Sequence, residues 1–460
     1  MTSCGHTTQH RENASDFTHP WKPSLNHWVL HLKFESSRFY KSTKIREFRF
    51  MPKFSIVIPS ARPHLLPSAL RSAVEQDFDD YEVIVSDNSG IGGCKIVIES
   101  FGSHEIRYVK PPSKLDVTPH WDFAISHALG DWVVLLCDDD ALLPCALKIL
   151  DRYINKNQEV DSIKWQLNAH SRVQNNHRKH TVSMPACRGK VDEYDAKDLL
   201  LKMFESGTGL FRVKHTLPFM PLATYRRELI EKVRSKQDGH KFFHPPCPMT
   251  SGAFGYLAFA NKTLVLDLPL TVIGDPPDSA GNQAMNDEAY KEMHNTVSLE
   301  YVPIKSMLLF PSTSAESLLR AREALVDYVP ELTLNYPMYF LACALAIKEL
   351  ERMSADVSAV KKMFDQALSE YPKYIQIEFN RLLGKEMNKQ QINMTKSKIL
   401  LSNIKHKVKI IIKSIIGTSM PEYQKWNAED IHVEDVYDAA IYVNDILKSH
   451  SLGAEPNSTY

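Results

Sequence analysis

Three consecutive carboxylates, Asp138, Asp139 and Asp140, follow directly on the apolar run 132–137. Such a run predicts a strand that is buried on both faces of a parallel sheet, and its polar end emerges at the carboxyl edge, where open α/β sheets bind ligands. Adjacent carboxylates repel one another, and a cation relieves that repulsion. Oxygen ligands of this kind suit Mg²⁺ or Mn²⁺, which keep positions open for the phosphates of a nucleotide. The alternative is a turn that caps the helix beginning near Pro144.

Strands and helices alternate on either side of this stretch. Strands are predicted at 54–59, 81–86 and 106–109, and helices near 65–74, 95–101 and 119–129. Repeated strand–helix units in this order predict an α/β fold with a doubly wound, mostly parallel sheet. The second strand delivers Asp87 and Asn88 at its carboxyl end. If the strands are near neighbours, these side chains share a crevice with the three carboxylates.

Composition narrows the class of protein. Lys+Arg and Asp+Glu both total 55, so the formal net charge is zero and nothing global indicates a nucleic-acid partner. The seven cysteines show no CxxC or zinc-type spacing, and their odd number argues against a disulfide framework, which favours a reducing cytoplasm. No apolar run approaches the length of a bilayer span. We therefore expect a cytoplasmic protein that is peripheral to the inner face of the membrane at most.

Four segments of the chain resemble the nucleotide-sugar half of family 2 glycosyltransferases, which have the GT-A fold. They are, in chain order, 55–59, 68–76, 82–89 and 130–140. Their order and their positions at the strand ends agree with the family, which is more specific than any single match. The resemblance covers residues 53–160 well and continues less closely to 275.

The resemblance implies an inverting, metal-dependent transferase. It would move a sugar from a nucleoside diphosphate sugar donor to a hydroxyl of a glycan or lipid-linked saccharide, in the biosynthesis of surface polysaccharides. Mg²⁺ or Mn²⁺ would be held by Asp138 and Asp140, with Asp139 in support, and would offset the charge of the departing diphosphate.

The same resemblance assigns the donor contacts. The donor-binding residues would be Pro59, Asp87, Asn88, Lys114, Asp138 and Asp139. Asp87 would accept a hydrogen bond from the nucleotide base, although Asp-Asn-Ser-Gly is also good turn chemistry. Lys114 would lie near the nucleotide, or else it is a solvated loop residue. Where many members have Gly/Ala-Arg-Asn, this chain has residues 119–124 in Pro-His-Trp-Asp-Phe-Ala, which leaves the donor open.

Inverting transfer also needs a general base that is aimed at the acceptor hydroxyl. Related enzymes place an acid after a proline in the region around 238–249, and Met249 stands at that position here. The nearest candidates are Asp238, His240 and His244, of which we take Asp238 and His244 as the catalytic candidates. If none of them is the base, the chain would bind a donor without turning it over.

The pattern divides the chain into five parts. These are an extension that is disordered or not native (1–50), a glycosyltransferase domain (51–275, with a nucleotide-sugar half 51–160 and an acceptor half 161–275), a flexible linker (276–311), a helical region (312–450) and a disordered tail (451–460). The basic, amphipathic stretch 389–416 predicts either peripheral contact with an anionic membrane or packing on the catalytic domain.

Two other function classes remain open from the residues alone. A nucleotidyltransferase also holds a metal on carboxylates, but that class typically has a glycine-rich, basic loop after the first strand, and residues 60–63 contain no glycine. A non-catalytic scaffold that binds partners through its C-terminal helices is the other alternative. A Rossmann dehydrogenase is disfavoured because no GxGxxG follows the first strand.

Overall fold

The computed structural model describes residues 51–102, 106–166, 169–172, 180–185, 187–207, 217–274, 276, 297–328, 332–352, 354–403 and 423–450. The predicted extension 1–50 and tail 451–460 lie outside these residues, as do 277–296 of the predicted linker and 404–416 of the predicted basic helix. Statements about absent features below concern the described residues.

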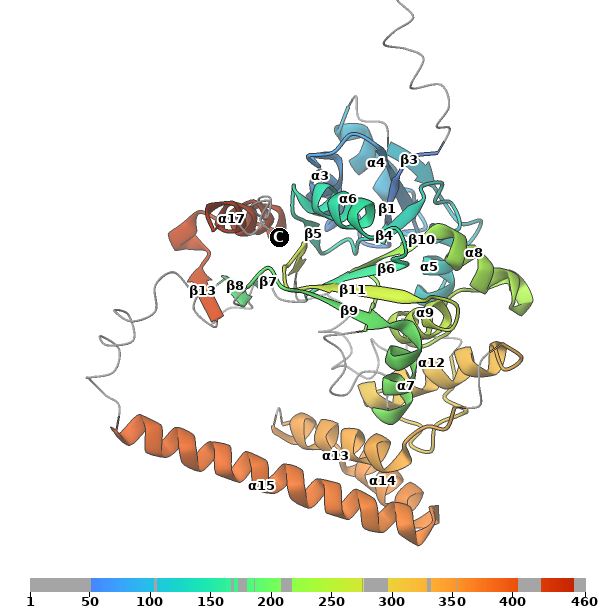
Figure 1. Cartoon of the computed structure of the whole chain (residues 1–460), viewed down its shortest axis with the longest axis vertical. Helices are drawn as coiled ribbons and strands as arrows, with labels where there is room; N and C mark the ends of the chain where they lie inside the picture. Colours follow the sequence, from blue (N-terminus) through green and yellow to red (C-terminus); the bar gives the residue numbers. More distant parts are fainter. Residues whose placement is uncertain are drawn as a thin grey trace, which may run out of the picture. The chain divides into compact units, whose positions relative to one another are not determined.

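An eight-stranded sheet carries the fold, with the strand order β3-β2-β1-β4-β10-β6-β11-β9 (Figure 1). Its strands are β1 (Phe54–Ser60), β2 (Tyr81–Asp87), β3 (Ile106–Val109), β4 (Trp132–Leu135), β6 (Ser162–Trp165), β9 (Val191–Asp195), β10 (Ala223–Arg226) and β11 (Lys262–Leu266). Strands β3, β2, β1 and β4 run parallel, whereas β10 is antiparallel to β4 and β6, and β9 to β11. The expected α/β fold with a mostly parallel sheet is confirmed.

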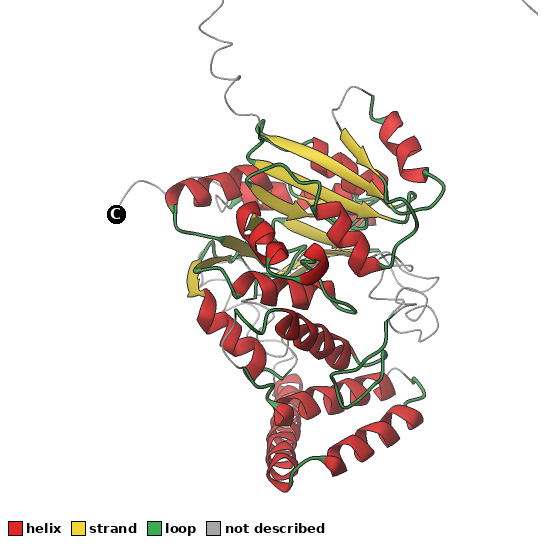
Figure 2. Cartoon of the chain, turned by 90° about the vertical axis from the view of Figure 1, so that its right-hand side faces the viewer, coloured by secondary structure: helices red, strands yellow, loops and turns green. Residues whose placement is uncertain are grey.

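Side chains alternate between the two faces of this sheet, and each face has its own core. Phe54, Ile56 and Ile58 of β1 pack in one core, whereas Val57 packs in the other. The first face is covered by α3 (Leu66–Val74), α4 (Gly93–Ser100) and α6 (Ala146–Lys156), and the second by α5 (Val117–Ile125), α7 (Ala196–Glu205), α8 (Arg227–Ser235) and α9 (Pro248–Leu257). Figure 2 shows helices on both sides of the strands. Coverage on both faces explains why β1 and β4 are buried throughout.

A second sheet joins distant parts of the chain, in the order β13-β8-β7-β12-β5. Its strands are β5 (Ala141–Leu142), β7 (Ala169–Arg172), β8 (Thr181–Pro185), β12 (Thr271–Gly274) and β13 (Tyr423–Asn427). Strand β5 follows the three carboxylates directly, and β12 pairs with it. The strand β13 lies in the stretch for which the sequence predicted only helices. Its residues, Tyr-Gln-Lys-Trp-Asn, show no clear helical or strand periodicity. They form a strand because their backbone groups pair with β8, which lies far away in the sequence.

The C-terminal helix α17 (Val436–Ser449) packs against α3 and against the second sheet. Ser68 donates a hydrogen bond of 2.7 Å to Asp435, and the Tyr437 hydroxyl bonds Glu75. The Arg71 guanidinium lies 4.2 Å from the centre of the Tyr437 ring. Residues 423–450 are therefore packed on the catalytic domain rather than on the helices that precede them in sequence.

Four described helices lie in sequence between β12 and β13: α12 (Phe310–Ala324), α13 (Tyr336–Arg352), α14 (Ser358–Glu370) and α15 (Lys373–Asn403). Short 3₁₀ helices lie elsewhere, at η1 (Asp238–His240) and η2 (Glu429–Ile431). Helix α12 packs on α9 through small side chains, with Thr250 and Ser314 hydroxyls 2.8 Å apart. Among the described helices, none is long and apolar enough to cross a membrane.

The buried carboxylate of Glu316 fixes the chain just before α12. It accepts the backbone N–H groups of Glu300, Tyr301 and Val302 at 2.8–3.1 Å and pairs with Arg320 at 2.7 Å. This arrangement satisfies a charge that is fully buried. The described end of the predicted linker is thus tied to α12.

The burial of α17 predicts that the C-terminal segment contributes to the stability of the catalytic domain. Val443 is fully buried against the second sheet. A Val443→Asp substitution places an unpaired charge there and should lower the free energy of unfolding by about 3 kcal/mol or more in urea titrations. Asp445→Asn, on the exposed side of the same helix, is the control and should change it by less than about 0.5 kcal/mol. Equal effects of the two substitutions would contradict the packing of α17.

Candidate functional site

The carboxyl ends of β1 and β4 meet at Asp138. The Ser60 hydroxyl donates a hydrogen bond of 2.8 Å to Asp138 Oδ2, and the Arg62 guanidinium pairs with Asp138 and, at 3.2 Å, with Asp139. Asp138 is only 3% exposed. Its charge is therefore balanced by a hydroxyl and a guanidinium from the turn that follows β1.

Asp140 is held from the opposite side by the end of β12. The backbone N–H of Gly274 donates a hydrogen bond of 3.0 Å to Asp140 Oδ1. A Cβ atom at Gly274 would lie 1.7 Å from the carbonyl oxygen of Asp139, so only glycine allows this close approach of the two backbones. Strand β12 thereby fixes the second and third carboxylates together.

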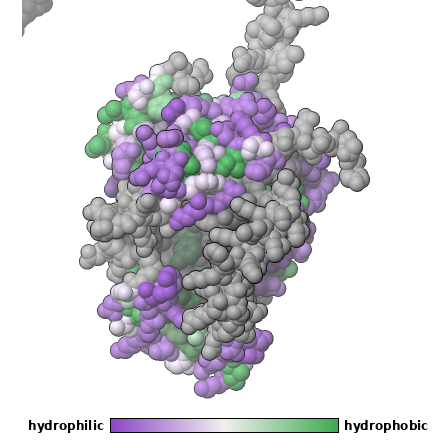
Figure 3. Space-filling model, turned by 90° about the vertical axis from the view of Figure 1, so that its left-hand side faces the viewer, coloured by the Kyte–Doolittle hydropathy of each residue, from purple (hydrophilic) through white to green (hydrophobic). Residues whose placement is uncertain are grey.

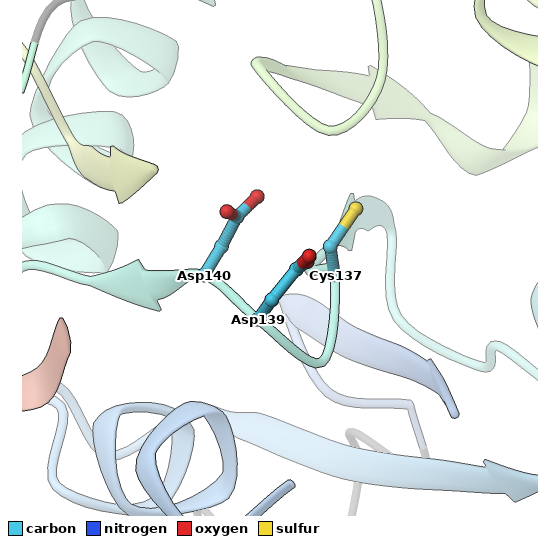
Figure 4. Close-up of side chains that lie close together, drawn as sticks. All are labelled: Cys137, Asp139 and Asp140. Carbon is cyan, nitrogen blue, oxygen red and sulfur yellow. The ribbon is translucent and has the colours of Figure 1, made fainter. Parts of the chain in front are cut away.

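Asp139 and Asp140 form a possible metal-binding group together with the Cys137 thiol. One ligand atom from each of the three lies within 4.8 Å of the others, and Figure 4 shows the three side chains pointing to the same side of the loop. Burial raises the pKa of Asp140 well above its ordinary value, and burial raises that of Asp139 to about 6. Burial also raises the pKa of Cys137, so that the thiol stays neutral.

These groups fit a hard divalent cation. Two carboxylates whose charged forms are disfavoured gain most from a cation, and their oxygens are the ligands that Mg²⁺ and Mn²⁺ prefer, whereas a neutral thiol is a poor ligand for either ion. The sequence paired Asp138 with Asp140 as metal ligands. The structure brings Asp139 and Asp140 together and turns Asp138 towards Ser60 and Arg62, so the assignment of Asp138 stays a prediction.

Asp87 lies at the end of the neighbouring strand, where it pairs in register with Ser60. Its carboxylate is fully buried and accepts hydrogen bonds from the backbone N–H of Ser89 at 2.9 Å and from the Tyr108 hydroxyl at 3.1 Å. Burial by itself would raise the pKa of Asp87, but these hydrogen bonds outweigh it and lower the pKa below its ordinary value. A carboxylate whose ionised form is favoured therefore lies at the end of β2, on the other side of β1 from β4 and Asp138.

Asn88 holds the loop that carries Lys114. The side-chain amide of Asn88 donates to the Leu115 carbonyl at 2.8 Å and accepts from the Leu115 N–H at 2.9 Å. This pair of bonds fixes the loop that carries Lys114, whose side chain is exposed. Pro59 is buried within β1. Of these three predicted donor-binding residues, Asn88 and Pro59 shape the backbone around the site, and Lys114 is free to turn towards it.

The predicted general-base candidates lie in the loop between α8 and α9. The His244 imidazole Nε2 lies 2.6 Å from Gln237 Oε1, and the His244 backbone N–H donates to Ser251 at 2.8 Å. Burial lowers the pKa of His244 to about 4. Asp238 lies in η1, and its side chain is outside the described part of the chain. Met249 is half-buried against the core.

Three functional contacts were not predicted. The sequence analysis used the segment 60–63, which contains Arg62, only as a loop without glycine. In the structure Arg62 pairs with two carboxylates. Gly274 donates its backbone N–H to Asp140. Asp122 holds the acceptor loop by accepting the N–H groups of Phe242 and Phe243 at 2.8 and 3.2 Å. A lone arginine or glycine carries no sequence signal of this kind, although an aspartate in an otherwise apolar helix, as at Asp122, is a usable one.

Residues 55–234 match the family described as glycosyl transferase family 2. This part of the chain is a family 2 glycosyltransferase domain. A curated relative, GalNAc(5)-diNAcBac-PP-undecaprenol beta-1,3-glucosyltransferase of Campylobacter jejuni, is 33% identical over 110 residues, which are 23% of this chain and 36% of the relative. The chain thus spans about a third of the length of the curated relative that it matches.

Two solved structures align with this chain at low identity. TarS 1–349 of S. aureus in complex with UDP-GlcNAc is 16% identical, and the match covers 74% of this chain and 92% of that chain with a TM-score of 0.40. The mannosyltransferase PcManGT of Pyrobaculum calidifontis, in complex with GDP-Man and Mn2+, is 15% identical, with 72% and 84% covered and a TM-score of 0.33.

His120 of α5 contacts Ser86 of β2, and its burial predicts a pH effect on stability. Its Nε2 lies 2.9 Å from the Ser86 hydroxyl, and burial lowers its pKa from 6.5 to about 4. Because the unfolded chain then binds the proton more tightly, stability falls as the pH falls from 6.5 towards 4, by about 2 kcal/mol at pH 5 from this group.

Urea titrations at pH 7 and pH 5 check this prediction. Other titrating groups are shared by the wild-type protein and a His120→Gln variant, so the difference between their two pH dependences isolates His120. The variant should lose less stability between pH 7 and pH 5. The same loss in both proteins would show that His120 is not a buried neutral imidazole.

Proposed function

We propose that this protein is a glycosyltransferase that moves a sugar from a nucleoside diphosphate donor to a hydroxyl of a lipid-linked saccharide. The observation that carries the proposal is the placement of Asp87 and the Asp138–Asp140 carboxylates at the carboxyl ends of β2 and β4, the two parallel strands that flank β1, inside the segment that matches glycosyl transferase family 2. Open α/β sheets bind nucleotides at such an edge.

Asp87 would select the base of the donor. A carboxylate that stays ionised accepts hydrogen bonds and donates none, so it favours bases with a ring N–H, such as uracil, thymine and guanine. Cytosine and adenine present a ring acceptor at that edge and would be repelled. The hydrogen bonds from the Ser89 N–H and the Tyr108 hydroxyl hold this carboxylate in a fixed orientation.

A divalent cation held by Asp139 and Asp140, with Asp138 adjacent, would neutralise the diphosphate as it leaves. The chain's own residues contribute the rest. Asp87 holds the base, Asn88 fixes the loop of Lys114 beside the nucleotide, and Gly274 keeps the carboxylates aimed at one side. Fixed groups of this kind lower the barrier because they need no reorganisation during the reaction.

The acceptor hydroxyl would lose its proton to a group on the loop 238–249. His244 is a weak base because its pKa is lowered, and its Nε2 is engaged by Gln237, so we favour Asp238 as the base and His244 as a residue that positions the loop. If neither acts as the base, the protein would be a donor-binding scaffold, which is the second candidate function. A nucleotidyltransferase is disfavoured by the family of the domain.

The name of the Campylobacter relative supports an acceptor on a polyprenyl diphosphate. Such an acceptor would bring the protein to the cytoplasmic face of a membrane, in the assembly of a surface polysaccharide. The helix α15 runs into the basic stretch 389–416, and four large apolar side chains on α14 and α15, Met363, Tyr374, Ile377 and Met387, are exposed. The described surface drawn in Figure 3 is mostly hydrophilic with small apolar areas, which favours peripheral contact over insertion.

Calorimetric titration tests the donor site. Nucleoside diphosphates and their sugars (UDP, GDP, dTDP, CDP and ADP forms) are added with and without Mn²⁺. We expect metal-dependent binding of one base with a ring N–H. Asp87→Asn and Asp140→Ala should each weaken it about tenfold or more, because each removes a charged hydrogen-bond or metal contact. Asp77→Ala, an exposed carboxylate, is the control. No binding of any nucleotide would overturn the proposal.

Substitutions in the acceptor loop separate the base from its support. Once the donor is known, Asp238→Asn should lower kcat by about 10²-fold or more and leave donor affinity unchanged, since a general base acts only in the transition state. His244→Gln should lower the melting temperature and affect kcat less. A large kcat loss in His244→Gln alone, with full stability, would exchange the two roles.

A further inference from the structure

The Arg62 side chain is the most exposed member of its ion pairs with the carboxylate cluster. It pairs with both Asp138 and Asp139, and its side chain is 25% exposed, against 5% and 12% for the two carboxylates. Solvent, and a ligand that arrives from it, therefore reach the arginine more readily than either carboxylate. We propose that Arg62 is an exchangeable internal counterion, which neutralises the carboxylates before the metal binds and then moves to the diphosphate of the donor.

The turn after β1 does not depend on the Arg62 side chain. The Ser60 hydroxyl donates to Asp138 Oδ2 at 2.8 Å and accepts the backbone N–H of Arg62 at 3.2 Å. A further bond runs from the Asn88 N–H to the Ser60 carbonyl at 2.8 Å. These contacts fix the backbone at residue 62, so the long arginine side chain can leave the carboxylates while its attachment point stays in place.

Charge explains why the exchange would occur. One guanidinium faces three carboxylates, so a net negative charge remains in a buried site when all are ionised, and the remaining repulsion favours a divalent cation. Once a cation of charge +2 shares Asp139 and Asp140, the guanidinium loses part of its attraction to them. The planar fork of arginine matches two oxygens of a phosphate as well as those of a carboxylate.

A position two residues beyond β1 suits this second role. Ser60 pairs in register with Asp87 on the neighbouring strand β2, and its hydroxyl donates a hydrogen bond to Asp138. The donor, whose base would lie at Asp87 and whose diphosphate would lie at the metal, must therefore pass the turn that carries Arg62. The inference rests on the proposed function, since it takes a nucleoside diphosphate as the ligand.

The experiment compares the wild-type protein with Arg62→Gln and Arg62→Lys. Mn²⁺ binding without nucleotide is followed by electron paramagnetic resonance of the free ion, and diphosphate binding at saturating Mn²⁺ by calorimetry. Removal of a competing cation should tighten Mn²⁺ binding in Arg62→Gln by about threefold or more, while loss of the phosphate contact should weaken diphosphate binding about tenfold. Arg62→Lys, which keeps the charge but not the fork, should lie between the two.

Opposite signs for the two ligands are the mark of an exchangeable counterion. If Arg62 only supported the site, its loss would weaken both ligands or neither, and either result would overturn the inference. Lys148→Gln removes an equal charge from an exposed pair with Asp77 and should change neither affinity. Melting temperatures with and without Mn²⁺ show that each variant is folded, and Mn²⁺ should raise the melting temperature of Arg62→Gln more than that of the wild type.

Failure of the inference is distinct from failure of the proposed function. If the wild-type protein binds neither Mn²⁺ nor any nucleoside diphosphate, the proposed function is wrong and so is the inference. If the wild type binds both ligands and Arg62→Gln binds them with unchanged affinity, only the inference is wrong.

Discussion

Mutual repulsion among buried carboxylates is the constraint on which the rest of the site depends. Asp138 and Asp140 are each 3% exposed, and Asp139 lies between them. Removing such charges from water is costly unless each has a partner. The fold supplies three different partners: a guanidinium, a hydroxyl and the N–H of a glycine that no other residue could replace. The three carboxylates must therefore keep these partners for the chain to fold, and not only for it to bind a ligand.

Ser60 connects the two ends of the donor site. It pairs in register with Asp87, it donates to Asp138, and it accepts the N–H of Arg62. A single short residue at the end of β1 therefore fixes the positions of Asp87 and Asp138 relative to each other. Under the proposed function, this fixed spacing would favour nucleotide binding through pre-organisation.

Sequence reasoning succeeded where the signal is local. The apolar run before Asp138 and the strand that ends at Asp87 have a period that can be counted, and β1 and β2 begin and end within about a residue of the expected bounds. It failed where the partner lies far along the chain. The contact of Gly274 with Asp140 spans 134 residues, and the pairing of β13 with β8 joins segments more than two hundred residues apart. No periodicity records such contacts.

The site residues divide in the same way. The places of Asp87 and Asp140 at strand ends could be predicted because a family motif puts them there, and their roles stay predictions. The pairing of Arg62 could not be predicted, because its two carboxylates approach it only in the folded sheet. The general base is the hardest to predict, since it must match an acceptor about which the domain carries little information. Loop residues set such specificity and vary independently of the scaffold.

The C-terminal segment shows that the helical region is bound to the catalytic domain at both ends. Its first helix, α12, packs on α9 beside the acceptor loop, and its last, α17, contacts β5 and β12, the two strands that bracket the carboxylates. A helix packed on β12 supports the backbone of Gly274 and, through it, the position of Asp140. Helix α17 is therefore a second layer of support for the site, because a shift of α17 would be passed to the Gly274 N–H that donates to the third carboxylate.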